Sequence, residues 1–180
     1  AEQAQLMPQE ELLAVQKRNN NLTISIPKET SFQEKRVALT PEAVGLLVNN
    51  GHVVLVEASA GQESHFSDTD YSEAGAQIVH ERDKIFQSEI IFKVAPPSLE
   101  EVEMMSGNQF LFSALQMTLQ PKESLEVLMK KKVTAVAWDY IKDSEDIYPV
   151  VRAMGEIAGN TSVLIASEYL SNANNGQGLM

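Results

Sequence analysis

Short apolar runs alternate with helical patterns from Leu22 onwards, and this alternation limits the possible folds more than any other feature of the chain. We expect strands at 22–26, 53–56, 77–79, 89–94, 109–115 and 133–138. The run at 89–94 is continuous and mostly apolar, which is typical of a strand buried on both faces. Helical patterns between these runs indicate right-handed βαβ units. The predicted fold class is therefore α/β, with a parallel β-sheet flanked by helices.

Local signals mark where several of the helices begin and end. Thr40 is a predicted N-cap, because Pro41 follows it at the first helical position. The sequence Asn49-Asn50-Gly51 predicts the end of that helix, since glycine suits a backbone with positive φ. Ser98-Leu99-Glu100-Glu101 fits a capping box that opens a later helix.

The chain divides into three predicted segments. Residues 1–21 read as an N-terminal helical extension, since Pro8, the acids after it and the bases at its end suit a short helix. Residues 22–147 form the α/β domain. Residues 148–180 hold a long connecting helix and then a polar linker.

Two glycines interrupt the long helical pattern, which runs from about Tyr148 to Leu170. Gly155 and Gly159 lie one turn apart on the same face. Each costs about 1 kcal/mol relative to alanine inside a helix. We therefore expect another backbone to approach this face closely.

The composition excludes several classes of protein. The chain has 14 Lys and Arg against 25 Asp and Glu, and its formal net charge of −11 disfavours a nucleic-acid partner. It has no cysteine, which excludes disulfides, thiolate metal sites and cysteine nucleophiles. No apolar run approaches the roughly 20 residues that span a bilayer, and the N-terminus has no secretory signal. We expect a cytoplasmic protein without membrane contact in this segment.

An ordered set of motifs carries a family resemblance. The set begins with Ile26-Pro27-Lys28-Glu29 and Arg36-Val37-Ala38-Leu39-Thr40-Pro41. The later motifs are Gly51-His52, Val56-Glu57, Ala60-Gly61, Tyr71 with Ala74-Gly75-Ala76, Glu89-Ile90-Ile91-Phe92-Lys93-Val94, and Met154-Gly155-Glu156-Ile157-Ala158-Gly159. Over roughly residues 22–178, the chain resembles the alanine dehydrogenase / nicotinamide nucleotide transhydrogenase α-subunit family.

The resemblance implies a Rossmann-like, substrate-side domain at the N-terminus of an NAD(P)-dependent oxidoreductase. The full enzyme would interconvert L-alanine and pyruvate with hydride transfer to NAD. NAD would be bound by a downstream Rossmann domain, whose Gly-x-Gly-x-x-Gly turn does not occur in this sequence. We therefore expect the 180-residue chain alone to be inactive and to bind NAD(H) weakly. The implied partners are a small amino or keto acid and, in the full-length protein, further copies in a homo-oligomer.

The resemblance also points to three catalytic candidates. Arg36 matches the arginine that holds the substrate carboxylate, and a guanidinium binds a carboxylate through two parallel charge-assisted bonds. Its alternative role is a surface pair with Glu34 or Glu29. Lys93 matches a lysine near a strand end, where it is either functional or only extends to solvent. Gln116 stands at the place of an acid/base histidine, although glutamine cannot exchange a proton near neutral pH.

The departures from the family pattern leave three functions open. Ala95 stands where alanine dehydrogenases usually have a second lysine, and losing one acid/base group typically costs about 10²–10⁴-fold in rate. Transhydrogenase α-subunits also lack that lysine and the histidine, but their Arg/Ser/Gln-rich loop is not seen between Asp139 and Pro149. The chain is thus an alanine dehydrogenase-like domain, a transhydrogenase-type domain, or a non-catalytic fragment that binds or oligomerises through its helices.

No metal site is predicted. The three histidines show no metal-ligand spacing. The acidic residues at 68–73 lack the glycine turn and terminal glutamate of a calcium loop, so they indicate a solvated start of a helix.

Overall fold

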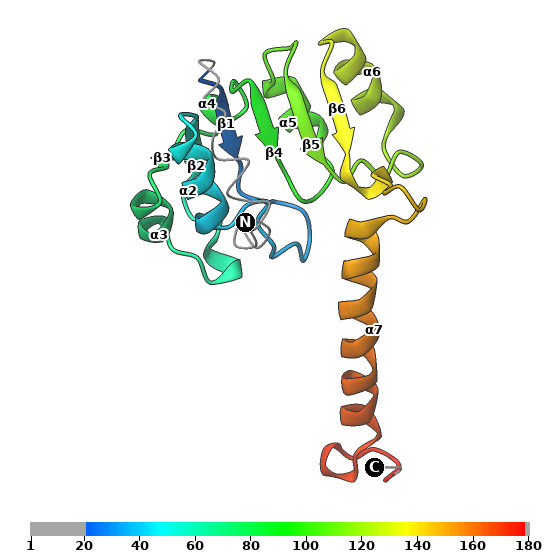
Figure 1. Cartoon of the computed structure of the whole chain (residues 1–180). Coiled ribbons are helices and arrows are strands. Elements are labelled where there is room, and N and C mark those ends of the chain that lie inside the picture. Colours follow the sequence, from blue (N-terminus) through cyan, green and yellow to red (C-terminus); the bar gives the residue numbers. More distant parts are fainter. Residues whose placement is uncertain (1–20, 179–180) are drawn as a thin grey trace, which may run out of the picture. The chain divides into compact units, whose positions relative to one another are not determined.

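The computed structural model describes residues 21–178, which form two compact units (Figure 1). The first unit extends to Val136 and the second begins at Ala137. The predicted N-terminal helix lies outside the described residues.

The first unit is built on a six-stranded parallel sheet with the order β3-β2-β1-β4-β5-β6. In chain order, the strands are β1 (Thr23–Ile26), β2 (Val53–Glu57), β3 (Gln77–Val79), β4 (Ile90–Phe92), β5 (Phe110–Ser113) and β6 (Thr134–Ala137). All six lie within the predicted strand ranges or extend them by one residue. The predicted parallel α/β fold is therefore confirmed. The order reverses between β1 and β4, because β2 and β3 lie on one side of β1 while β4 to β6 lie on the other.

Helices connect successive strands of this sheet (Figure 1). They are α2 (Pro41–Asn49), α3 (Asp68–Glu73), α4 (Arg82–Ile85), α5 (Leu99–Met104) and α6 (Lys122–Lys130), with a short 3-10 turn, η2, at Gln62–Ser64. The one-turn helix α4 had no sequence prediction. Its four residues are too few to show a helical period.

The predicted helix boundaries form as local hydrogen bonds. The Thr40 hydroxyl accepts a bond from the Ala43 N–H at 3.4 Å at the start of α2. Gly51 ends that helix with a φ of 91°, a left-handed conformation that glycine adopts at little cost. The Ser98 hydroxyl accepts from the Glu101 N–H, and the Glu101 carboxylate accepts from the Ser98 N–H. The predicted capping box of α5 is thus present.

The apolar core lies between the central strands and the helices. Ile26, Val44, Val56 and Tyr71 are completely buried in one cluster, which joins β1 and β2 to α2 and α3. Burying an aliphatic or aromatic side chain of this size contributes about 1.5–3 kcal/mol. This packing fixes the central strands, and it therefore fixes the loops that leave their carboxyl ends.

The second unit contains the long helix α7 (Pro149–Leu170) between two 3-10 turns, η3 (Trp138–Tyr140) and η4 (Asn172–Asn174). The predicted helix is therefore present. A Cβ built on Gly155 or Gly159 meets no described atom within 4 Å. Within residues 21–178, no backbone approaches this face in the way that we expected from the sequence.

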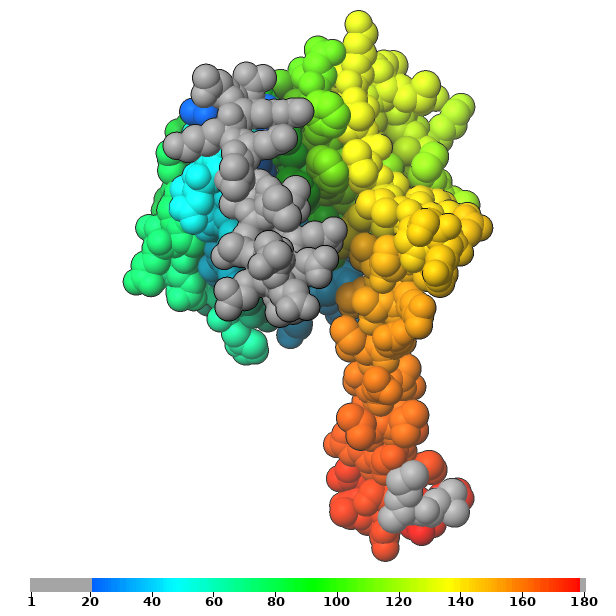
Figure 2. Space-filling view, in the orientation of Figure 1, coloured from blue at the N-terminus to red at the C-terminus, as the bar shows by residue number. Residues whose placement is uncertain are grey.

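The apolar side chains of α7 are largely exposed within the described chain. The larger ones are Val151, Met154, Ile157, Val163, Leu164, Ile165 and Tyr169. This helix is drawn in orange to red in Figure 2. None of the helices in residues 21–178 has the length and apolar character needed to cross a membrane.

Candidate functional site at the carboxyl edge of the sheet

Two oppositely charged side chains meet where the strand order reverses. Glu29 follows β1 and Lys93 follows β4, and these strands are neighbours in the sheet. The Lys93 ammonium lies 3.0 Å from the Glu29 carboxylate, while the other carboxylate oxygen accepts from the Val94 N–H at 2.6 Å. Open α/β sheets commonly hold their ligands outside the carboxyl ends of strands at such a reversal. The position of this pair therefore marks the region in which to look for a site.

The pair belongs to a larger buried charge network. Lys93 also bonds Glu101 at 3.2 Å, and its own side chain is only 1% exposed. Arg82 bonds the same Glu101 oxygen, and its guanidinium reaches Glu57 at 2.7 Å. Three carboxylates and two cations thus lie together, with a formal sum of −1. Lys93 is buried within this network, so its side chain does not extend to solvent.

Backbone groups complete the network. The second oxygen of Glu101 accepts from the Ser98 N–H at 2.8 Å, as part of the capping box. Glu57 accepts from the Lys28 N–H at 2.8 Å, and Arg82 also donates to the Lys28 carbonyl at 3.3 Å. Buried charges are tolerated only when such partners replace the lost water. The network therefore ties the loop after β1 to β2, α4 and α5.

Arg36 lies in a small cleft on the same loop. The cleft is also lined by Glu29, Glu34, Lys28 and Lys35, and by three residues that follow β2, namely Ser59, Ala60 and Glu63. Its volume is about 10 Å³, roughly the room that one water molecule needs. Glu29 is thus shared, because it bonds Lys93 and also lines the cleft of Arg36.

The Arg36 guanidinium holds the Glu34 carboxylate in a two-bond fork. Its Nε donates to Oε1 at 2.8 Å and its Nη2 donates to Oε2 at 2.6 Å. Hydrogen bonding to Arg36 lowers the pKa of Glu34, and the bond to Glu34 raises the pKa of Arg36. Both groups are therefore held in their charged forms. Of the two alternatives for Arg36, the pairing with Glu34 is present in this structure.

Gln116 lies beyond the carboxyl end of β5 on an exposed stretch of chain. Its φ of 42° is positive, a left-handed conformation that is uncommon outside glycine. The described lining of the Arg36 cleft does not include it. The structure thus links Arg36 to Lys93 through Glu29, and it places Gln116 on a separate loop at the same edge.

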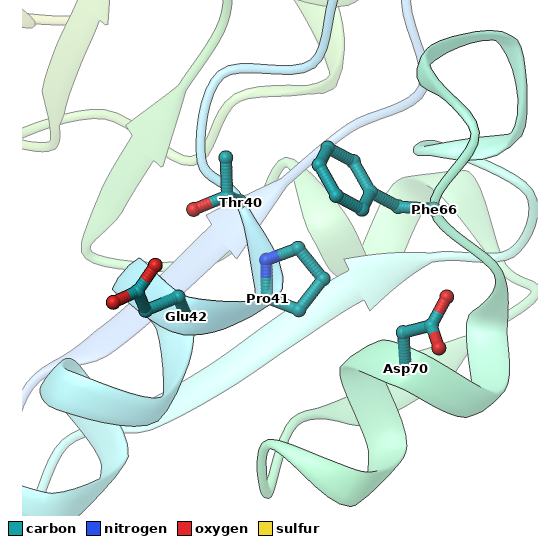
Figure 3. Close-up of a pocket in the computed structure, with 5 residues that line it drawn as sticks. All are labelled: Thr40, Pro41, Glu42, Phe66 and Asp70. Atoms are coloured by element: carbon teal, nitrogen blue, oxygen red, sulfur yellow. The ribbon is translucent and has the colours of Figure 1, made fainter.

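A broader depression lies beside the start of α2 (Figure 3). Its volume is about 420 Å³, and its lining is Thr40, Pro41, Glu42, Phe66 and Asp70. Figure 3 shows the carboxylates of Glu42 and Asp70 on two different helices, with Pro41 between them and Phe66 above. This lining has two carboxylates and no cation to offset their repulsion of an acidic ligand, whereas the smaller cleft also contains three cations, so we assign the candidate acid site to the cleft of Arg36.

The described residues, 21–178, offer neither a metal site nor a nucleotide site. They contain no group of three or more His, Cys, Asp or Glu side chains arranged to hold a metal. Asp68 and Asp70 instead accept hydrogen bonds from Ser59 and Ser67. Gly176 follows a 3-10 turn rather than a strand, and a Cβ there meets the Tyr169 carbonyl at 2.4 Å. The described residues therefore do not fit a pyrophosphate-binding turn.

Three members of the charge network had no functional prediction. The sequence predicts no site role for Glu57 or Arg82, and for Glu101 it predicts only the capping of α5. The one available signal was the polar ending of β2, where Glu57 closes an otherwise apolar strand. Their mutual contacts depend on strand order, which residue types alone do not give.

Comparison with known proteins identifies the family. The family model described as "Alanine dehydrogenase/PNT, N-terminal domain" matches residues 25–158. An alanine dehydrogenase of Staphylococcus saprophyticus is 36% identical over 159 residues, covering 88% of this chain and 43% of its own. Alanine dehydrogenase 2 of Staphylococcus aureus is 35% identical, covering 88% of this chain and 42% of its own.

Solved structures agree with these relatives. An L-alanine dehydrogenase structure superposes with a TM-score of 0.82 at 35% identity, covering 87% of this chain and 43% of its own. A transhydrogenase from Sinorhizobium meliloti gives a TM-score of 0.73 at 25% identity, covering 82% of this chain and 44% of its own. The chain thus spans less than half the length of the relatives that it matches. It belongs to the alanine dehydrogenase/PNT N-terminal domain family.

Proposed function

We propose that this chain is the substrate-side domain of an alanine dehydrogenase-like oxidoreductase. In the complete enzyme, L-alanine, NAD⁺ and water would give pyruvate, ammonium, NADH and a proton. Arg36 would hold the carboxylate of the amino or keto acid. The 180-residue chain alone would be inactive, and residues outside it would bind the nucleotide.

The position of Arg36 is the observation that carries this proposal. Its guanidinium lies in a cleft at the carboxyl edge of a parallel sheet, and Glu29 connects that cleft to the reversal of strand order. A guanidinium fork is suited to a small carboxylate, and Arg36 already binds a carboxylate in this way within its own chain. The similarity to alanine dehydrogenases then supports alanine and pyruvate as the pair of acids.

Arg36 and Lys93 would have different roles. Arg36 would contact substrate. Lys93, buried between Glu29 and Glu101, would instead hold Glu29 in position at the cleft of Arg36. Gln116 would donate or accept hydrogen bonds at the edge without transferring a proton. The proton steps of the reaction would therefore need a group other than Gln116.

The test is NAD⁺ reduction by L-alanine in a polypeptide that contains this chain and a nucleotide-binding domain. Arg36→Gln removes the charge and the fork, and a lost charged hydrogen bond costs about 1.5–3 kcal/mol. We expect kcat/KM for L-alanine to fall by about 10–100-fold, mostly through KM. Arg152→Gln is the matched control, because Arg152 is an exposed arginine that pairs with Glu156 at 3.0 Å on α7. An unchanged KM in Arg36→Gln would contradict the proposal.

A second candidate is a transhydrogenase-type domain, in which hydride passes between two nicotinamide nucleotides. The observation in its favour is that Ala95 and Gln116 replace the lysine and histidine of the alanine dehydrogenase pattern. Hydride exchange between NADH and an oxidised NADP analogue, without turnover of L-alanine, would favour this candidate over the first.

A further inference from the structure

The fork of Arg36 is already filled by a carboxylate of the same chain. The two bonds from Nε and Nη2 to Glu34 have the arrangement in which a guanidinium binds a free carboxylate. Under the proposed function, Glu34 therefore stands where the carboxylate of the substrate would bind.

Glu34 is held in this position by the backbone around it. Its N–H donates to the Ser31 carbonyl at 3.1 Å, and Gln33 between them has a φ of 60°. Its Oε1 also accepts from the Arg36 N–H at 3.0 Å. The Glu34 side chain is 13% exposed, whereas that of Arg36 is 53% exposed. The carboxylate is thus the more enclosed partner, and it is tethered beside the guanidinium.

The cleft leaves no room for a second acid beside Glu34. Its volume of about 10 Å³ accommodates roughly one water, and pyruvate has six heavy atoms. A tethered group also competes at a high effective concentration, of millimolar order for short flexible links. An acid that uses this fork must therefore replace Glu34.

We propose that Glu34 is an internal competitor for the Arg36 guanidinium, which an incoming amino or keto acid displaces. Glu34 then determines how tightly the site binds a monocarboxylate, and it is a specificity-determining residue although it makes no bond to the reacting atoms. The inference rests on the proposed function, because it requires Arg36 to be the carboxylate-binding group.

The test measures pyruvate binding to the ¹⁵N-labelled 180-residue chain through its backbone amide resonances, which every variant retains. Glu34→Gln retains an oxygen that accepts from the Arg36 N–H but removes the competing charge. We expect its Kd for pyruvate to be about 2–5-fold lower than that of the parent chain. Glu34→Asp, which retains the charge but withdraws it by one methylene, is the second variant and should also lower the Kd.

Glu63→Gln is the matched control. Glu63 lines the same cleft but pairs with Lys35, at 3.6 Å, rather than with the fork. Its removal changes the local charge equally, and we expect less than about a twofold change in Kd. Equal tightening in Glu34→Gln and Glu63→Gln would reflect general electrostatics and would overturn the inference.

The remaining outcomes separate this inference from the proposed function. Loss of binding in Arg36→Gln, together with unchanged or weaker binding in both Glu34 variants, overturns the inference and leaves Arg36 as the carboxylate-binding group. Parent-like binding in Arg36→Gln overturns both. Absence of any pyruvate response in the parent and in both Glu34 variants also overturns the inference. Thermal unfolding of each variant establishes that the comparison is made between folded chains.

Discussion

Replacing Lys93 with methionine should destabilise the first unit strongly. Methionine approximates the length of lysine but removes the ammonium group. The Lys93 ammonium lies 3.0 Å from Glu29 and 3.2 Å from Glu101, and all three side chains are at most 4% exposed. The substitution therefore removes a buried cation from between two buried carboxylates.

The expected loss of stability follows from the bonds that the two carboxylates keep after Lys93 is replaced. Glu101 keeps its bonds to Arg82 and to the Ser98 N–H, but Glu29 keeps only the bond from the Val94 N–H among those that the structure shows for its carboxylate. The formal sum of the network changes from −1 to −2. Breaking a buried ion pair by removing one partner costs about 3–5 kcal/mol, and a domain has about 5–15 kcal/mol in total.

Urea unfolding of the 180-residue chain measures this effect, with the slope m checked for two-state behaviour. We expect Lys93→Met to lower the free energy of unfolding by about 3–5 kcal/mol. Lys122→Met is the matched control, because Lys122 pairs with Glu126 at 3.4 Å on an exposed surface of α6. An exposed pair is worth about 0–1 kcal/mol, so the control should remain close to the parent.

A double variant tests whether the destabilisation comes from the carboxylate that Lys93→Met leaves unpaired. Adding Glu29→Gln to Lys93→Met removes the carboxylate that has lost most of its partners and returns the formal sum to −1. We expect the double variant to be more stable than the sum of the single effects predicts, by about 0.5–3 kcal/mol. A cost below about 1 kcal/mol for Lys93→Met, or strict additivity in the double variant, would refute the buried network as described.

Two further predictions concern Tyr71 and the long helix. Burial raises the pKa of Tyr71 to about 12 from 10.0, and its hydroxyl donates to the Leu39 carbonyl at 2.8 Å. The neutral phenol therefore contributes stability that is complete below pH 10 and is lost as the pH rises through 12, by about 2–3 kcal/mol. The urea midpoint of Tyr71→Phe should therefore fall less than that of the parent between pH 9 and 12. An equal fall in the two proteins would show that ionisation of Tyr71 is not the cause. Gly155→Ala should raise the stability of α7 by about 1 kcal/mol, because no described atom lies within 4 Å of the added Cβ. A lower melting temperature would contradict this reason.

The fold was predictable because its signals are local. Apolar runs, the N-cap at Thr40, the stop at Gly51 and the capping box at Ser98 each act within a few residues. The regular alternation of strands and helices then predicts a parallel sheet, although it does not give the order of the strands. The one-turn helix α4 was missed for the same reason, since four residues contain too little periodicity to be recognised.

The charge network was only partly predictable because its contacts are distant in sequence. Glu29 and Lys93 are 64 residues apart, and Arg82 and Glu57 are 25 apart. They meet because β1 lies between β2 and β4, an order that no single motif specifies. Glu101 has two roles, of which the local sequence pattern predicts only the capping of α5. One of its oxygens caps that helix, while the other accepts from Arg82 and Lys93.

This network also explains why Arg36 lies where it does. The attraction within a buried ion pair often fails to offset the cost of removing both charges from water, so apolar replacements can leave the protein equally stable. The hydrogen bonds of such a pair nevertheless form only in a narrow range of geometries. Glu29 can accept from Lys93 and from the Val94 N–H only if the loop after β1 crosses to β4. Thr40 fixes the other end of that loop by capping α2. The arginine is thus carried on a segment restrained at both ends, and the position of its guanidinium depends on the buried charge network as well as on its own bonds to Glu34.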